Sequence, residues 1–291
     1  KSPTSSRFEW QGRALGTQAK MQIHHNDQSK AAKIVAQSLQ ELERLERIFS
    51  LYRPDSELVA LNRDGYLARP SFELREVLAE SIRISELSRG AFDVTVQPLW
   101  ESHRNFHAEG KVANKAAIET ALRLVDYRKL EVSPSQIRLP VKGMAITLNG
   151  IAQGYITDRI ADLMHNSGHD RVLVQMGEIH GRAPNNQPWR IGLDGLSDQV
   201  SLTTGAVATS SGSGTKFSNT ANHLINPSNG TSPGHYNSVS IIAARAMTAD
   251  AISTAIYTAA KSLSAEISSA SGIQGFVLEH ADGRIERSWD S

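Results

Sequence analysis

The spacing of apolar residues over positions 29–49 constrains the fold of this 291-residue chain more than any other sequence feature. Apolar side chains recur there at helical spacing while Glu and Arg fill the opposite face, which predicts a long amphipathic helix with a solvated outer side. Similar patterns predict helices over about 71–88, 152–167 and 248–263. Each of these helices needs an apolar surface to pack against.

Short strand-like segments lie between these helices and can supply that surface. Because strands and helices do not alternate strictly, the pattern favours an α+β fold over a doubly wound parallel sheet. We find no linker long enough to separate independent domains, so residues 1–291 are expected to form a single domain of two closely packed halves. The expected strands cover residues 8–15, 19–24, the region around 130, 137–139, 145–148, 171–175, 189–193 and 238–243.

The composition excludes several classes of chemistry and partner. Thirty-one basic and 30 acidic residues leave a formal charge of +1, which argues against nucleic acid as the main partner. The chain has no cysteine, so oxygen and imidazole groups must carry any chemistry. The absence of thiols suits an oxidising compartment, and no apolar run is long enough to cross a bilayer. Because the chain begins without Met, we expect a processed, exported form whose signal or lipid anchor lay upstream.

The segment from Thr248 to Ala255 is a candidate metal half-site. On a helix, Asp250 and Thr254 are four residues apart and Ser253 is three from Asp250, so their oxygen atoms share one face. Magnesium takes one or two carboxylates and completes its shell with other oxygen ligands. The simpler alternative makes Thr248 an N-cap and Asp250 an acid in the first helical turn.

Four other segments are candidates for ligand contacts. A strand runs through Gly150 into a helix at residues 148–155, a junction that suits phosphate but also an ordinary tight turn. His223, followed by Ile225 and Pro227, could accept a proton from an attacking hydroxyl. The turn at 90–96 could expose Phe92 and Asp93 to a nucleotide before a β-type run, or bury Phe92 in the core. Residues 51–58 combine an aromatic side chain with a proline turn, although a capped short helix would explain most of that pattern.

Taken together and in order, these segments resemble the ApbE family of FAD:protein FMN transferases. The resemblance spans nearly the whole chain. The motifs that carry it are Leu15-Gly16-Thr17, Tyr52-Arg53-Pro54-Asp55-Ser56-Glu57, Gly90-Ala91-Phe92-Asp93-Val94-Thr95-Val96, Gly150-Ile151-Ala152-Gln153-Gly154-Tyr155, Gly205-Ala206-Val207-Ala208-Thr209-Ser210, His223-Leu224-Ile225-Asn226-Pro227 and Asp250-Ala251-Ile252-Ser253-Thr254.

The resemblance implies a T-fold-like architecture of antiparallel and mixed sheets wrapped by helices, and it assigns roles to residues. Magnesium would be held by Asp250, Thr254 and a carbonyl at Gly150, with Ser253 close by. His223 lies where the family has a histidine beside the phosphates, and we expect His223 and Asp250 to be the catalytic residues. The residues expected to contact FAD are Leu15, Tyr52, Ala91, Phe92, Asp93, Thr147, Gln153 and Ile225.

The implied reaction cleaves FAD with release of AMP and leaves FMN on a Thr or Ser hydroxyl of a client flavoprotein. A FAD pyrophosphatase and a non-catalytic FAD-binding protein are the alternatives. The expected location is periplasmic, with a membrane involved only through proximity or a removed anchor.

This chain departs from the usual family pattern at several positions. Gln153 stands where the family has Lys or Glu, while Thr147 and Asn226 stand where it has Asp. The common double glycine near Gly177 is replaced by Gly177-Glu178. This local sequence resembles the NosX branch of the family, whose client is the membrane flavoprotein NosR.

Overall fold

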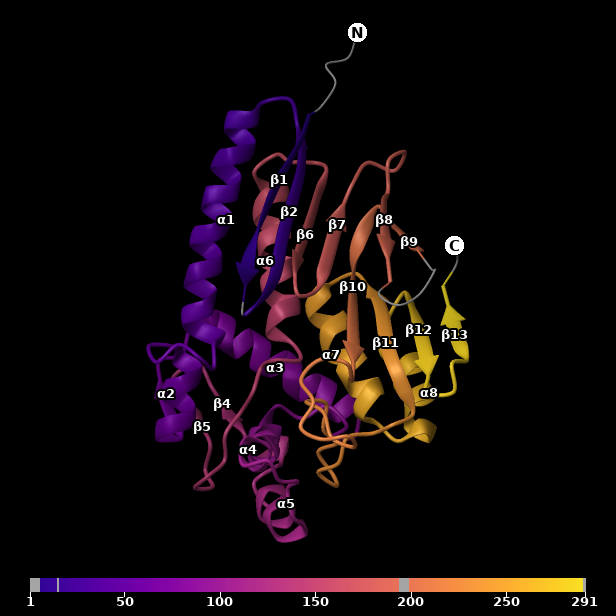
Figure 1. The fold of residues 1–291 in the computed structure, drawn as a ribbon. Helices are drawn as coiled ribbons and strands as arrows, with labels where there is room; N and C mark the ends of the chain where they lie inside the picture. The colour runs from indigo at the N-terminus through magenta and orange to yellow at the C-terminus, as the bar shows by residue number, and fades with distance from the viewer. Residues whose placement is uncertain (1–5, 15, 194–198, 290–291) are drawn as a thin grey trace.

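The computed structural model describes residues 6–14, 16–193 and 199–289, and an eight-stranded sheet runs through its centre (Figure 1). The strand order is β1-β2-β6-β7-β10-β11-β12-β13, and every neighbouring pair is antiparallel. Antiparallel neighbours need no helical crossover, so hairpins can follow one another along the chain. The strands are β1 (Ser6–Ala14), β2 (Thr17–His25), β6 (Val172–Met176), β7 (Ile179–Arg182), β10 (Thr204–Ser211), β11 (Tyr236–Ala243), β12 (Gly275–His280) and β13 (Ile285–Ser288).

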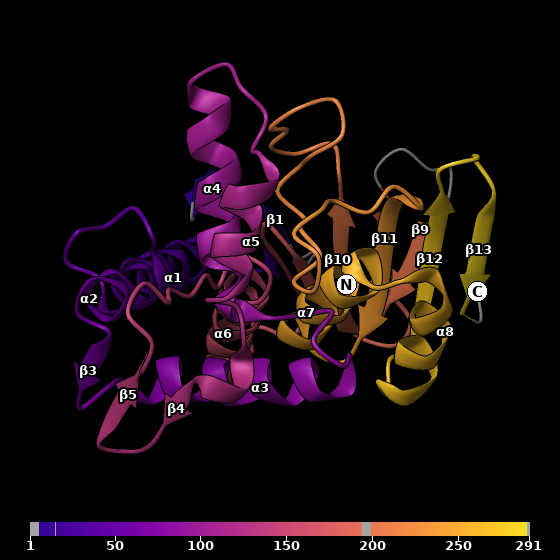
Figure 2. The ribbon, with the colours of Figure 1, turned by 90° about the horizontal axis from the view of Figure 1, so that it is seen from below.

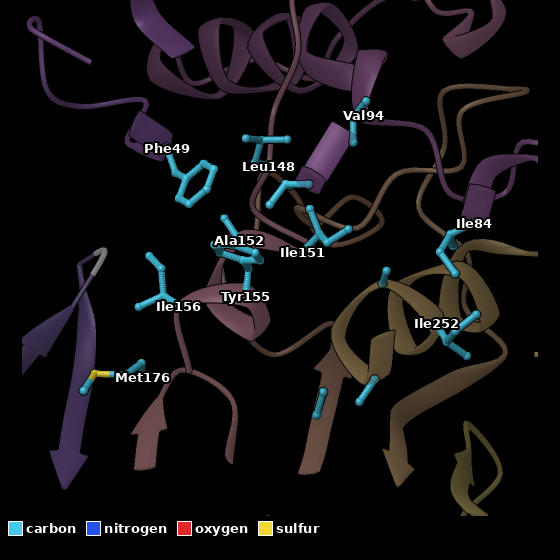
Figure 3. Packing of buried hydrophobic residues seen from close by; sticks show 14 of the residues in the cluster. Phe49, Ile84, Val94, Leu148, Ile151, Ala152, Tyr155, Ile156, Met176 and Ile252 are labelled. Carbon is cyan, nitrogen blue, oxygen red and sulfur yellow. The ribbon is translucent and has the colours of Figure 1, made fainter. Parts of the chain in front are cut away.

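Three helices cover one face of this sheet. Helix α1 (Gln28–Phe49) packs on β1 and β2, α6 (Ala152–Asn166) on β6 and β7, and α7 (Ala246–Thr258) on β10 and β11. Helices α3 (Phe72–Leu87) and α8 (Lys261–Ala270) pack against α7. The apolar faces of these elements meet in one core, in which Phe49, Tyr155 and Ile252 come from three different helices (Figure 3).

The opposite face of the sheet is partly covered by a hairpin of β8 (Trp189–Gly192) and β9 (Gln199–Leu202). Its buried side chains form a second, smaller cluster with Val207, Ile242 and Val277 of the sheet. Side chains alternate between the faces of a strand, so Val207 contacts this hairpin while Ala206 and Ala208 point to the helices.

Smaller elements close one end of the molecule (Figure 2). They comprise helices α2 (Glu57–Asp64), α4 (Gln97–Ala108) and α5 (Lys115–Leu122), the 3-10 helices η1 (Val94–Val96) and η2 (Tyr127–Lys129), and a sheet of β3 (Tyr66–Ala68), β5 (Gln136–Arg138) and β4 (Glu131–Val132). The loop between β10 and β11, residues 212–235, passes close to α4 in this view.

The α+β prediction is confirmed, as are most expected elements, but three expectations are wrong. The β-branched run Val94–Val96 is a 3-10 helix, because Asp93 caps it and Pro98 starts α4 directly afterwards. Residues 145–148 form no strand, because the side chain of Asn62 forms hydrogen bonds with both the backbone N–H and the carbonyl oxygen of Ile146. The helix expected over 248–263 is two helices, α7 and α8, separated at residues 259–260.

Across the described ranges, we find no helix that combines the length and the apolar character required to cross a membrane.

Candidate active site

A cleft of about 550 Å³ opens at one end of the large sheet. Helix α4 lies at the same end of the sheet (Figure 1). It is built from the start of β2, the segment before η1, the start of α6, the end of β10 and α7. Its volume is typical of small-molecule sites. The predicted site residues that line it are Ala91, Phe92, Asp93, Thr147, Gly150, Gln153, His223, Ile225, Asp250 and Thr254.

Asp250 is held at the bottom of this cleft by the contact between α6 and α7. Its carboxylate accepts a hydrogen bond from the backbone N–H of Gly154 (3.1 Å), in the first turn of α6. Gly154 is a necessary glycine, because a Cβ there would lie 2.7 Å from Met247 Cα and closer still to the Ala246 carbonyl oxygen. Burial raises the pKa of Asp250 to about 7, although the Gly154 N–H acts in the opposite direction.

The start of α7 differs from the simpler alternative reading of this segment. The helix begins at Ala246 with Arg245 as its N-cap, so Thr248 is not the cap. Asp158 of α6 instead accepts the N–H groups of Ala246 (2.8 Å) and Met247 (3.0 Å). The same carboxylate forms a hydrogen bond with His180 Nδ1 (2.6 Å). Asp158, His180 and Ala246 are buried, and Met247 is partly buried. Asp158 therefore fixes the helix that carries Asp250.

The hydroxyl of Thr254 lies directly against the backbone of Gly150. A Cβ at Gly150 would be 3.0 Å from Thr254 Oγ1, so a side chain there would force this hydroxyl to shift. Ser210 of β10 hydrogen-bonds Thr254 Oγ1 (3.2 Å) and Ser253 Oγ (2.8 Å). Ser253 also donates to the carbonyl of Asp250 (2.9 Å), so it supports the site from beneath and does not line the cleft.

Glu178 is a cleft residue that the sequence reasoning did not assign. It lies in the turn between β6 and β7, and its carboxylate accepts the N–H of Thr209 (3.2 Å). Burial and the nearby Asp250 raise the pKa of Glu178 well above the usual value for Glu. The available signal was the replacement of the family's second glycine by an acidic residue at this position.

His223 lies on the loop after β10, where its ring packs against Gly214. Its Nδ1 bonds the carbonyl oxygen of Thr215 (3.3 Å), and its backbone N–H donates to the same oxygen (2.9 Å). A proton on Nδ1 leaves Nε2 with a free lone pair. Burial lowers the pKa of His223, so the ring is neutral at neutral pH.

The other end of the cleft is apolar, with Phe92, Val94, Trp100, Leu224 and Ile225 in its walls. Asp93 is buried here, and the N–H groups of Thr95 (2.8 Å) and Tyr127 (3.0 Å) donate to its carboxylate. Asp93 thus shapes the turn, and its burial raises its pKa. An apolar wall next to buried acids can hold a flat ring at one end and a charged group at the other.

The remaining predicted residues lie in different places. Gln153 lies between Thr17, its hydrogen-bond partner at 3.5 Å, and Gly177, so it joins the β1–β2 and β6–β7 turns. Tyr52 is 73% exposed and lines a separate hollow that meets the cleft at Trp100. Leu15 lies outside the described residues.

The donor set at the cleft bottom fits magnesium. The part of the chain that the structure describes holds no group of three His, Asp or Glu side chains arranged for a metal. Magnesium does not need one, because one or two carboxylates with hydroxyl, carbonyl and water oxygens suffice. Two buried acids with raised pKa values favour a nearby cation, which would stabilise their ionised forms.

The fold and the cleft define an α+β protein with a small-molecule site between the end of an antiparallel sheet and its covering helices. The chain belongs to the ApbE family, whose model matches residues 15–276. The curated FAD:protein FMN transferase of Salmonella typhimurium is 24% identical, over 100% of this chain and 88% of that protein. The ApbE-like architecture is therefore confirmed.

Two solved structures have the same fold. The ApbE protein of Thermotoga maritima superposes with a TM-score of 0.84 at 26% identity, over 97% of each chain. The flavin transferase ApbE of Vibrio cholerae gives a TM-score of 0.83 at 23% identity, over 99% of this chain and 98% of that one.

Proposed function

We propose that this chain is a magnesium-dependent FAD:protein FMN transferase. The observation that carries the proposal is the convergence of Asp250, the Thr254 hydroxyl and the Gly150 backbone at the bottom of the cleft. Family membership supports it, because curated relatives carry this activity in their names. Asp250, Thr254 and a Gly150 carbonyl would hold the metal, with FAD lying toward Phe92 and Ile225.

The transfer exchanges one phosphorus–oxygen bond for another. A client Thr or Ser hydroxyl oxygen bonds to the phosphorus of the FMN half, and the bond from that phosphorus to the bridging oxygen breaks. AMP leaves with the bridging oxygen, and the hydroxyl proton passes to Nε2 of His223. Magnesium, when bound, neutralises charge that builds on the phosphate oxygens. Asp250 would lie beside that cation, which lowers the basicity of its carboxylate, so it is a poor base for the hydroxyl.

The finer assignments belong to this proposal as well. We place the reaction in the periplasm, which the lack of cysteine supports, and we take a NosR-like flavoprotein as the first client to test. The replacement of the second glycine by Glu178 supports the NosX branch. Water in place of the client hydroxyl would turn the same site into a FAD pyrophosphatase.

Incubation of the chain with FAD, magnesium and the client tests the proposal. We expect covalent FMN on the client by mass spectrometry, together with AMP. AMP without labelled client would favour a pyrophosphatase, and neither product would favour a FAD carrier. Asp250→Ala should reduce transfer by at least about a thousandfold, since transition-state charge stabilisation is worth several kcal/mol. Glu109→Gln, on the exposed end of α4, is the control, and near-normal transfer by Asp250→Ala would contradict the metal assignment.

A further inference from the structure

A second hollow, which we call the outer groove, continues from the cleft onto the face of the sheet that the helices leave uncovered. Its volume is about 970 Å³, and Gly177, Glu178, Thr209, Ser211 and Ser213 line both spaces. Gly192 at the end of β8 and the following Leu193 form one wall, and the loop of residues 212–235 forms the other. The outer groove is therefore a direct route to the candidate reaction site.

Successive side chains of β10 point to opposite faces of the sheet, so this strand contributes residues to both the cleft and the outer groove. Ser210 faces α7 and bonds Ser253 and Thr254, beside the candidate metal ligands. Thr209 and Ser211, its neighbours, point to the opposite face and line the outer groove. A chain lying in the groove and passing the end of β10 thus comes within reach of the cleft.

The end of β10 also presents an open sheet edge at this junction. β10 pairs with β7 over Thr204–Val207, whereas its pairing with β11 continues to Ser211. Beyond Val207, the β7 side of β10 has no strand partner among the described residues, and the Thr209 N–H is bound by the Glu178 carboxylate instead. Open edges of this kind bind extended peptides by adding a strand.

The lining of the outer groove suits a polypeptide backbone better than a charged small molecule. Hydroxyl and amide side chains dominate it, among them Ser218, Asn219, Thr220 and Asn222, while Lys216 and Glu279 offer opposite charges. Such groups can donate to and accept from peptide bonds without selecting one charge. The hollow on the other side of the cleft carries Arg63, Arg104, Arg138 and Lys142 against Asp64 and Glu101, so it is more cationic.

We propose that the outer groove receives an extended segment of the acceptor protein and delivers its Thr or Ser hydroxyl to the cleft beside His223. This inference rests on the proposed function and adds the acceptor-binding surface. The segment lies beside β10 beyond Val207, between residues 192–193 and the 212–235 loop. A short peptide that fills the outer groove is therefore the probe for this assignment.

Two exposed glycines on opposite walls can carry a bulky side chain at the rim of the outer groove, away from the cleft. Among the described residues, a Cβ at Gly192 or Gly234 would meet nothing within 4 Å, and neither residue needs a left-handed backbone. Gly192→Trp and Gly234→Trp should therefore fold normally. Ala265→Trp, on the exposed side of α8, is the matched control.

The experiment uses a bead-displayed library of short peptides, each with one central Thr or Ser, together with FAD and magnesium. We expect the unchanged chain to label a subset with fluorescent flavin, and both groove variants to raise the KM for a selected peptide about tenfold or more. The same peptide with Val at its centre should bind the variants about tenfold more weakly without FAD, by fluorescence anisotropy. The KM for FAD and the release of AMP without acceptor should stay within about twofold of the unchanged chain.

Other results would overturn the assignment in distinguishable ways. Unaltered peptide binding and labelling in both variants, or no labelled peptide with the unchanged chain while a whole client is labelled, would refute the groove as an acceptor site. A parallel rise in the KM for FAD would show that the groove holds part of FAD. Absence of both AMP release and transfer in the unchanged chain would refute the proposed function itself.

Discussion

Two buried acids, Asp250 and Glu178, determine the charge of the cleft in the absence of a ligand. Both carboxyl groups are buried, and burial is the main cause of both raised pKa values. The charge of Asp250 raises the pKa of Glu178 further, and that of Asp158 raises the pKa of Asp250. A carboxyl group whose pKa is raised in the folded protein stabilises the fold while protonated, and this contribution is lost as the pH rises. For Asp250, this contribution is lost as the pH rises from its ordinary pKa of 3.8 to its pKa of about 7 in the folded protein.

Asp250→Asn should therefore stabilise the metal-free protein at pH 8 by about 2 kcal/mol and change it little near pH 4. Asn keeps the acceptor for the Gly154 N–H but carries no charge. Urea unfolding followed by circular dichroism, with a chelator present, measures the difference. Added magnesium should stabilise the unchanged chain at pH 8 and have a much smaller effect on the variant. A variant less stable than the unchanged chain at pH 8 without metal would contradict this account.

At the scale of elements, the start of α7 decides where the candidate metal ligands lie. Asp158 holds that helix start through two backbone N–H groups and connects it to His180 of β7. Arg245 adds contacts to Asp158 and Asp162, and Arg182 pairs with Asp162 as well. The position of Asp250 therefore depends on an ion-pair network that contains no cleft residue.

Asp158→Ala should lower the free energy of unfolding by about 3 kcal/mol, because it leaves two backbone N–H groups and the buried His180 ring without their shared partner. Asp162→Ala is the matched control, since that carboxylate is partly exposed and its loss should cost about 1 kcal/mol. Denaturant unfolding of both variants gives the comparison. Equal losses would mean that the helix start is held mainly by other contacts.

The same scale shows what the sequence could and could not predict. The long helices α1, α3 and α6 were predictable because apolar periodicity is a local signal. The conformation of Ile146 was not, because its partner Asn62 is 84 residues away. Helical spacing placed Asp250 and Thr254 on one face, but the meeting of that face with Gly150 came from the family resemblance. Glu178 was missed because one acid after a strand carries no periodic signal.

At the scale of the whole molecule, one apolar core connects regions far apart in the sequence. Its buried members run from Ala14 in β1 to Leu278 in β12, and those in α1, α6 and α7 pack together (Figure 3). We propose on this basis that residues 1–291 form a single domain of two closely packed halves. A shared core makes partial unfolding costly, because either half would expose the apolar surface of the other.

Unfolding should therefore occur in one transition. Far-ultraviolet circular dichroism reports the helices, while tryptophan fluorescence is sensitive to Trp189 in the small outer cluster and Trp100 of α4. We expect both signals to change at the same urea concentration, within experimental error. Two separated midpoints would show that the halves unfold independently.

The absence of any side chain at Gly154 has an effect that reaches beyond local packing. Since the backbones of α6 and α7 touch there, even one added methyl group would force apart Thr254 of α7 and Gly150, which lies just before α6. The distance between these two candidate metal ligands thus depends on a helix contact that neither of them makes. Gly154 therefore influences the candidate site through the separation of two helices and not through any group that it could offer to a ligand.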